Sequence, residues 1–375
     1  MPARRRVGVE NPDMALLPHW VFPELDASAL GAARARQDTL TKPRGSLGVL
    51  EDLAVALAGI QGGAPASRPA AAVLFAADHP VARHGVSAYP PEVTAAMVAN
   101  FVRGGAAASV LCRNLGVDLR VVDVGVAHPY ERVDGGDGAR LRRDPVADDP
   151  IGDLRIEDAL SEVVYERALR AGAAEIDALD SDTRVVLLGD MGIGNTTAAA
   201  AMTALLLGLA PEDVVGAGTG VSGDALSRKI EVVRDATRRA QEVSGVLRTD
   251  PHRVVQAVGG KEIAALVGAM ARAIELRMAV LVDGFIVSTA ALALVRMCAE
   301  ARSGMLFAHR SAERGHAHVL AALDARPLLD LGMRLGEASA ALAALPLLDA
   351  ACALHAGMAT FASASVPDRA RPGTR

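Results

Sequence analysis

Short apolar runs of strand length recur along this chain, and segments with helical patterns separate them. The runs are AAVLFAAD (71–78), DLRVVDVGV (118–126), TRVVLLGD (183–190) and RMAVLVDGF (277–285). The helical patterns include PEVTAAMVANFVRGG (91–105), IEDALSEVVYERALRAGAAEID (156–177), TTAAAAMTALLLGL (196–209) and DALSRKIEVVRDATRRAQEV (224–243). Strands that are apolar throughout and alternate with helices are typical of a parallel sheet covered on both faces. The sequence therefore predicts an α/β fold.

The composition narrows the possible partners. Hydrophobic residues make up 51% of the 375 residues, but aromatic residues make up only 3%. A net charge of −5 leaves no basic excess for nucleic-acid binding, and few aromatic rings are available for base stacking. Three widely spaced cysteines, Cys112, Cys298 and Cys352, form no disulfide framework, so we expect a reducing cytoplasm.

Two segments bear on targeting. The N-terminal MPARRRVGVE is basic but lacks the apolar core of a signal peptide. The most apolar stretch, MAVLVDGFIVSTAALALV (278–295), is interrupted by Asp283 and Gly284, and an aspartate is costly at the centre of a bilayer. We therefore expect a buried strand and helix there and no membrane partner.

Three polar segments lack any periodicity: residues 1–20, residues 131–153 and the tail after 363. We expect them to be surface loops or disorder. DVVGAGTG (213–220) is interpreted either as a short strand that enters a glycine loop or as a loop alone.

Carboxylates follow the apolar runs. Asp78, Asp190 and Asp283 stand at or just past the ends of three runs, and Asp123 lies inside another. Ligands of parallel α/β sheets bind at the carboxyl ends of the strands. A single aspartate after a strand more often caps a turn, but several on one edge of the sheet favour a site.

A glycine turn follows Asp190. Gly192 and Gly194 permit a tight turn, and Asn195 or Thr196 is suited to cap the next helix, whose N-terminus would attract a phosphate. The order G-x-G-N-T-T matches neither a Walker A motif nor a dinucleotide fingerprint. A plain strand-to-helix turn is the alternative interpretation.

Further polar groups extend the candidate site. The second glycine loop, 213–220, precedes Lys229, and the pair suits a phosphate. The segment AHRSAERGH (308–316) adds Ser311 and two arginines, although lone cations usually lie on the solvated surface. Glu337 stands among small and apolar residues, either as a helix-start residue or as a buried acid with a raised pKa, which would make a good general base.

Histidines raise the question of a metal. His79 and His84, beside Asp78, are candidate residues of a metal-dependent phosphohydrolase, and His309, His316 and His318 form a second histidine group. No HExxH or similar ligand spacing is present, so we expect no metal.

Nine stretches, taken together, resemble one family, that of nicotinate-nucleotide–dimethylbenzimidazole phosphoribosyltransferase. They are DTLTKPRGSLGVLEDLA (38–54), AADHPVARHGVSAYPPEVT (76–94), VVDVGV (121–126), GDMGIGNTTAAAA (189–201), VGAGTG (215–220), VGGKEIAAL (258–266), LVDGFIVSTAAL (281–292), HRSAERGH (309–316) and LGEASAALAALP (335–346). Each is weak alone, but the ordered set covers roughly residues 25–360 and is highly specific.

The resemblance implies an architecture. It consists of a large nucleotide-binding α/β domain with a three-layer Rossmann-like parallel sheet, and a smaller, mainly helical domain assembled from both ends of the chain. The expected boundaries are a flexible N-terminus (1–24), the helical domain (25–70 and 325–362), the α/β domain (71–324) and a flexible tail (363–375). The resemblance also implies a homodimer.

The resemblance further implies a reaction. The 5-phosphoribosyl group of nicotinate mononucleotide passes to 5,6-dimethylbenzimidazole with inversion, which gives α-ribazole 5′-phosphate and nicotinate for the lower ligand of cobalamin. No cofactor or metal is implied. Glu337 matches the family's base, and Asp190 matches a second carboxylate. The implied nucleotide and phosphate contacts are Gly192, Gly194, Asn195, Thr196, Gly218, Lys229, Asp283 and Ser311, and the implied benzimidazole contacts are Asp78, Tyr89, Met97 and Leu335.

The chain departs from the family pattern at several positions. Asp190 replaces a glutamate, and Ala338 and Ala340 replace glycines. Pro80 replaces a glycine, and Lys261 stands where an aromatic residue is common. These departures bear on base specificity and turnover. One alternative is therefore a family member that binds nucleotide or base with altered specificity or little turnover, and a weaker one is the metal-dependent phosphohydrolase.

Overall fold

The computed structural model describes residues 20–130, 138–218, 220–246 and 248–367. At its centre lies a six-stranded sheet with the strand order β3-β2-β1-β4-β5-β6, and every neighbouring pair is parallel. The strands are β1 (Ala70–Ala77), β2 (Asp118–Gly125), β3 (Arg140–Arg143), β4 (Val185–Met191), β5 (Ala279–Val282) and β6 (Met305–Phe307). The strand order reverses between β1 and β4, so the crevice where such sheets bind ligands lies at the carboxyl ends of these strands.

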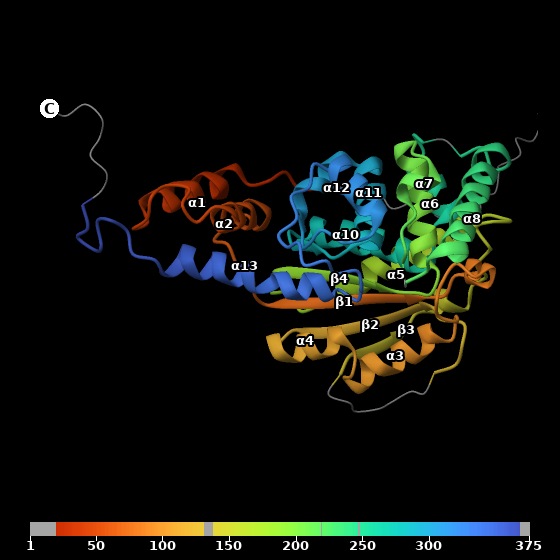
Figure 1. The fold of residues 1–375 in the computed structure, drawn as a ribbon. Helices are drawn as coiled ribbons and strands as arrows, with labels where there is room; N and C mark the ends of the chain where they lie inside the picture. Colours follow the sequence, from red (N-terminus) through yellow and green to blue (C-terminus); the bar gives the residue numbers. More distant parts are fainter. Residues whose placement is uncertain (1–19, 131–137, 219, 247, 368–375) are drawn as a thin grey trace, which may run out of the picture.

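Helices cover both faces of the sheet. The helices are α1 (Ala27–Thr39), α2 (Val49–Gln61), α3 (Val93–Arg103), α4 (Ala107–Leu115), α5 (Glu162–Asp177), α6 (Asn195–Leu207), α7 (Pro211–Val214), α8 (Gly223–Glu242), α9 (Pro251–Val258), α10 (Lys261–Glu275), α11 (Phe285–Met297), α12 (Arg314–Ala322) and α13 (Ser339–Gly357). Three 3₁₀ turns complete the elements: η1 (Pro80–His84), η2 (Pro145–Asp148) and η3 (Ala299–Gly304). Figure 1 shows α3 and α4 on one side of the sheet, with α5, α6 and α10 on the other.

The alternation of side chains along each strand divides the core in two. In β1, Val73 and Phe75 face the apolar cluster built with α5, α6, α10 and α11, whereas Ala72 and Leu74 face the cluster built with α2, α3, α4 and α13. Helices α5 and α10 approach closely because glycines stand at their contact. A Cβ atom at Gly172 would collide with the carbonyl oxygen of Ala265.

The predicted parallel sheet is confirmed, but two strands were not expected. Residues 140–148, placed in an irregular segment, form β3 and η2 instead, while residues 131–137 lie outside the described residues. β3 is a charged edge strand whose arginines pair with acids, such as Arg142 with Glu175, so it has no apolar run to reveal it. The three-residue β6 is too short for such a signal. The described residues of the stretch 213–220 form the end of α7 and a loop, and none of them is in a strand.

The apolar stretch 278–295 forms β5 and most of α11, and both elements are buried, as expected. Two other stretches, Val93–Leu115 and Ser339–Gly357, are long and apolar enough to cross a membrane by length and composition alone. Both are partly buried inside the fold, and core helices pass the same test. They are therefore weak evidence for a membrane span.

Helix α1, near the start of the chain, lies against the end of α13 and the segment that follows it. Arg36 of α1 donates hydrogen bonds to the carbonyl oxygens of His355, Ala356 and Met358, and Leu40 forms an isolated antiparallel bridge with Thr360. α13 runs from this region to the sheet (Figure 1). The division into two domains and the flexibility of the termini stay predictions.

Candidate active site

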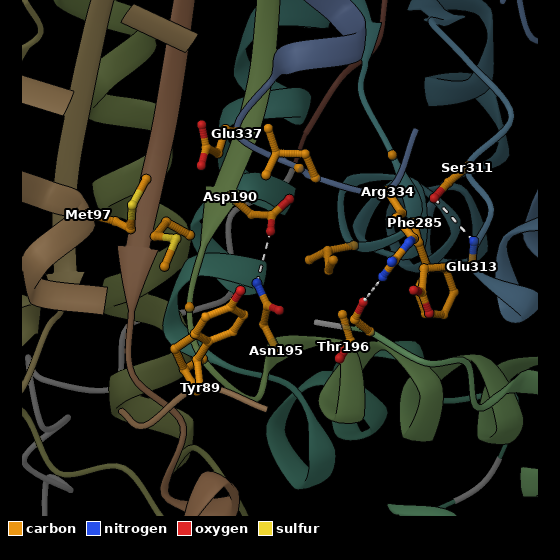
Figure 2. A pocket seen from close by; sticks show the side chains of 18 of the residues that line it. Tyr89, Met97, Asp190, Asn195, Thr196, Phe285, Ser311, Glu313, Arg334 and Glu337 are labelled. Atoms are coloured by element: carbon orange, nitrogen blue, oxygen red, sulfur yellow. Dashed lines mark hydrogen bonds between the residues drawn. The ribbon is translucent and has the colours of Figure 1, made fainter. Parts of the chain in front are cut away.

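A cavity of about 590 Å³ opens at the carboxyl ends of β4 and β5. Its wall comes from α3 and the turn before it, the segment from Asp190 to Thr196, the start of α11, the segment 309–313 and the segment 334–337. Figure 2 shows Asp190 between Glu337 and Met97 on one side and Thr196, Arg334 and Ser311 on the other. Segments that are far apart in the sequence therefore meet at the predicted crevice.

Glu337 lies in the cavity wall, two residues before α13 begins. Its side chain is buried, and its Oε2 atom has no hydrogen-bond partner. Burial raises the pKa of Glu337 to about 7, although the backbone N–H of Ala108 acts in the opposite direction. The structure thus supports the buried-acid interpretation, and a carboxyl group titrating near neutral pH is suited to general base catalysis.

Asp190 is the second carboxyl group of the cavity. It lies near the end of β4, where Asn195 Nδ2 donates to its Oδ2 atom at 2.9 Å and its Oδ1 atom has no partner. Burial, followed by the charges of Asp283 and Glu262, raises the pKa of Asp190 well above its ordinary value. Folding therefore favours its protonated form.

Asp283 holds the first turn of α13, next to Glu337, by hydrogen bonds. Its Oδ1 atom accepts the backbone N–H groups of Ala340 and Ala341, both at 2.8 Å, at the first turn of α13. Burial raises the pKa of Asp283 to about 7. Asp283 is not among the cavity-lining residues, so it lies behind the Glu337 segment, and its contact with a nucleotide stays a prediction.

The glycine turn after β4 forms the floor of the cavity. Gly194 has a φ of 102° and precedes the first residue of α6, and a Cβ atom at Gly192 would collide with the carbonyl oxygen of Ala77. Gly192, Asn195 and Thr196 line the cavity, while Gly194 does not. The backbone N–H of Ile193 donates to Thr94 Oγ1 at 3.1 Å, which ties the turn to α3.

The predicted phosphate contacts separate into two groups. Gly218 and Ser311 line the cavity. Lys229 does not, because it is 1% exposed and its Nζ atom donates to Thr196 Oγ1 at 2.8 Å and to the carbonyl oxygen of Gly216 at 3.3 Å. Burial lowers the pKa of Lys229 to about 8. The lysine therefore lies behind the cavity wall.

The predicted base pocket is partly assembled. Tyr89, Met97 and Leu335 line the cavity, and Tyr89 and Leu335 are 54% and 57% exposed. Asp78 is not a lining residue, and its Oδ2 atom accepts the backbone N–H of Ala127. Lys261 is buried at the start of α10, where it donates to backbone carbonyl oxygens, so this departure does not touch the cavity.

Four polar or aromatic lining residues were not among the predicted contacts: Phe285, His309, Glu313 and Arg334. Each stands within or beside a quoted stretch, so proximity to those stretches was the available signal. Their inward positions depend on loop conformations that no periodicity reveals.

The histidines do not assemble a metal site in the described part of the chain. His79 Nε2 lies 2.6 Å from Glu262 Oε1, and His84 Nε2 lies 2.7 Å from Asp153 Oδ2. No group of three or more potential metal ligands occurs among the described residues. The arrangement therefore gives no support to the phosphohydrolase alternative.

Comparison with known proteins agrees with this geometry. A family model described as phosphoribosyltransferase matches residues 22–366. The nicotinate-nucleotide–dimethylbenzimidazole phosphoribosyltransferase of Bradyrhizobium sp. (strain ORS 278) is 49% identical over 367 residues, which cover 94% of this chain and 99% of the relative. The chain belongs to this phosphoribosyltransferase family.

Further relatives cover the phosphoribosyltransferase chain almost completely. The enzyme of the same name from Pseudomonas aeruginosa PAO1 is 47% identical over 92% of this chain and 96% of the relative. The crystal structure of CobT from Thermus thermophilus superimposes with a TM-score of 0.83 at 41% identity, over 91% of this chain and 100% of that one. The chain thus shares its fold with this solved structure over nearly its whole length, including the central sheet.

Proposed function

We propose that this chain transfers the 5-phosphoribosyl group of nicotinate mononucleotide to 5,6-dimethylbenzimidazole. The products are α-ribazole 5′-phosphate and nicotinate, and the reaction serves assembly of the lower ligand of cobalamin. The relatives' names carry the substrate class to this chain. One observation carries the chemistry: a buried carboxyl group, Glu337, has a free oxygen atom in the wall of a cavity beside apolar side chains.

The reaction requires the protein to position the two substrates and to supply a base for the benzimidazole proton. One benzimidazole nitrogen attacks the anomeric carbon while the bond to nicotinate breaks, and the pyridinium nitrogen accepts the bonding electrons. Glu337 takes the proton from the other benzimidazole nitrogen, so no positive charge remains on the product base. Met97 and Leu335 offer the apolar wall that a flat base requires.

The test is an assay of chelator-treated protein with both substrates, followed by chromatography of nicotinate and the new nucleotide. We expect product without added metal. Glu337→Gln keeps the shape of the side chain but cannot take a proton, so kcat is expected to fall by about 10²–10⁴-fold. Full activity of this variant would contradict the assigned role, and tight binding without product from the wild type would favour the alternative of binding with little turnover.

The pH dependence gives a second test of the same residue. Because Glu337 acts only when deprotonated and its pKa is about 7, kcat/KM is expected to fall as the pH drops below about 7. The profile is measured from about pH 5.5 to about pH 9, a range that brackets this pKa. A profile that stays flat across the acidic half of the range would contradict a base with this pKa.

Four further assignments remain parts of the proposal. The protein is cytoplasmic, it works without a cofactor, and its active form is a homodimer. Asp190 acts near the nicotinate and the ribose, in keeping with its place in the middle of the cavity (Figure 2).

A further inference from the structure

The segment 309–313, between β6 and α12, contributes three polar side chains to the cavity wall: His309, Ser311 and Glu313. All three residues are buried, and the segment forms no helix or strand of its own. Its conformation must therefore be fixed by contacts with other parts of the chain. Figure 2 shows Ser311 and Glu313 across the cavity from Met97, which the proposed function assigns to the benzimidazole.

One side of this segment is held by backbone hydrogen bonds. The backbone N–H of Arg310 donates to the carbonyl oxygen of Leu329 at 2.8 Å, and that of Ala312 donates to the carbonyl oxygen of Met333 at 3.1 Å. The accepting stretch of chain continues directly to Glu337. The segment is therefore joined to the part of the chain that carries the proposed base.

His316, in the first turn of α12, holds the other side of the segment. The backbone N–H of Ser311 donates to its Nδ1 atom at 2.8 Å, and its Nε2 atom lies 2.9 Å from Ser288 Oγ on α11. A peptide N–H acts only as a donor, so Nδ1 carries no hydrogen and the ring hydrogen is on Nε2, which donates to Ser288. These contacts select one neutral tautomer of His316.

The surroundings of His316 keep its ring neutral. Burial, followed by the charges of His309 and Arg310, lowers the pKa of His316 to about 3. The rings of Phe285 and His309 lie beside it, with centroids at 6.4 and 6.0 Å. His316 is fully buried and is not a cavity-lining residue, so it can act on the cavity only through the groups that it holds.

We propose that His316, as the neutral Nε2–H tautomer held by Ser288, is a positioning residue that fixes the segment 309–313 in the cavity wall; this inference rests on the proposed function. Without the acceptor on His316, the buried backbone N–H of Ser311 would lack a partner, and the lining side chains of the segment would lose their fixed positions. A fixed wall binds its ligand more tightly than a loose one, because less conformational freedom is lost on binding.

The kinetic experiment compares His316→Leu with His316→Asn. Leucine offers no acceptor to Ser311, so the KM for nicotinate mononucleotide is expected to rise about 10- to 100-fold, the effect of one buried N–H left unpaired. The KM for dimethylbenzimidazole is expected to stay near the wild-type value, because the wall assigned to the base lies across the cavity. Asparagine brings an acceptor oxygen close to the position of Nδ1, so His316→Asn is expected to restore most of the nucleotide affinity.

Two further variants complete the comparison. His318→Asn is the matched control, since His318 belongs to the same helix and is exposed, and it is expected to keep both wild-type KM values. Ser288→Ala removes the partner of Nε2–H but leaves the acceptor for Ser311 on the ring. Its KM for nicotinate mononucleotide is therefore expected to rise, but by less than in His316→Leu.

NMR spectroscopy of the isotope-labelled histidines tests the tautomer without any substrate. The ring signals that disappear in His316→Asn identify His316. We expect a hydrogen on Nε2 and none on Nδ1 from about pH 5.5 to about pH 8.5, because the pKa of about 3 lies below this range.

Three results would overturn the inference: a hydrogen on Nδ1 of His316 in this pH range, a wild-type KM for nicotinate mononucleotide in His316→Leu, or an equal rise in His316→Leu and His316→Asn. Should His316→Leu fail to fold, a wild-type KM in Ser288→Ala would overturn it instead. If the wild type releases no nicotinate, the proposed function fails separately. Calorimetric affinities for nicotinate mononucleotide then replace the KM values, and the tautomer is still read from the spectrum.

Discussion

Ala338 and Ala340 are both buried alanines in one short segment, but their backbones differ. Ala338 has a φ of 58°, in the left-handed region, whereas Ala340 lies in the first turn of α13. The left-handed conformation costs an alanine roughly 1–2 kcal/mol. Of the two replaced family glycines, only the first therefore carries backbone strain, and the second favours the helix.

Glycine substitutions at these two positions form a matched pair. Each removes one buried methyl group and adds the same freedom to the unfolded chain, but only Ala338→Gly relieves strain. The Ala338→Gly variant is expected to be more stable than Ala340→Gly by about 1–2 kcal/mol in urea denaturation. Equal losses of stability would argue against a left-handed residue at 338.

The raised pKa of Asp190 makes the stability of the protein depend on pH. Folding raises the pKa of Asp190, so the native state binds its proton more tightly than the unfolded state does. The associated stability is present at low pH and is lost as the pH rises. Asp190→Asn keeps the acceptor for Asn195 but has no charge to bury. Its Tm is therefore expected to exceed that of the wild type at about pH 8 and to approach it at about pH 5, and a constant difference across this range would contradict the linkage.

At the scale of elements, the turn between β4 and α6 packs against a buried histidine that pairs with a glutamate of another element. His79, after β1, contacts Glu262 in the first turn of α10, and a Cβ atom at Gly194 would lie 3.1 Å from His79 Cβ. Burial alone would lower the pKa of His79, but the charge and hydrogen bond of Glu262 raise it on balance. The pair thus joins β1 and α10 beneath the cavity floor.

Removing one partner of this pair is expected to be costly. Glu262→Gln leaves a buried histidine without its counter-charge and should lower the free energy of unfolding by about 3–5 kcal/mol. The double variant with His79→Gln should recover part of that loss, because no charge is left unpaired. Denaturation of the wild type, both single variants and the double variant gives the coupling energy, and strictly additive losses would show that the pair is not coupled.

The elements also show what a sequence pattern can and cannot predict. β1, β2, β4 and β5 lie in the buried centre of the sheet, so their sequences are apolar on both faces and were predictable. β3 and β6 are the short edge strands. β3 consists mostly of arginines, and β6 is apolar but only three residues long, so neither has a recognisable apolar run. The effect of Pro80 was also not predictable from the sequence pattern. It occupies the first position of η1, where its missing N–H has no cost.

At the scale of the whole molecule, the predicted homodimer is testable. Tyr89 and Leu335 keep more than half of their surfaces exposed in the cavity wall, where a second subunit would shield them. The chain has a mass of 38.6 kDa, so a dimer has twice that, 77.2 kDa. Sedimentation equilibrium is expected to give the dimer mass, and activity is expected to fall on dilution below the dissociation constant. A monomer mass at every concentration would contradict the prediction.

The amino-acid sequence by itself determined the α/β class, the central strands and the glycine turn before α6, and it made Glu337 the candidate base. Those features depend on local chemistry: apolar periodicity, backbone freedom and a carboxyl group among small residues. Only the tertiary structure decided which groups face the cavity. It placed Lys229 and Asp283 behind the wall and Arg334 in it, because side-chain direction depends on loop conformation and on partners far away in the chain. The pKa of Glu337 was likewise decided by burial, which exists only in the folded molecule.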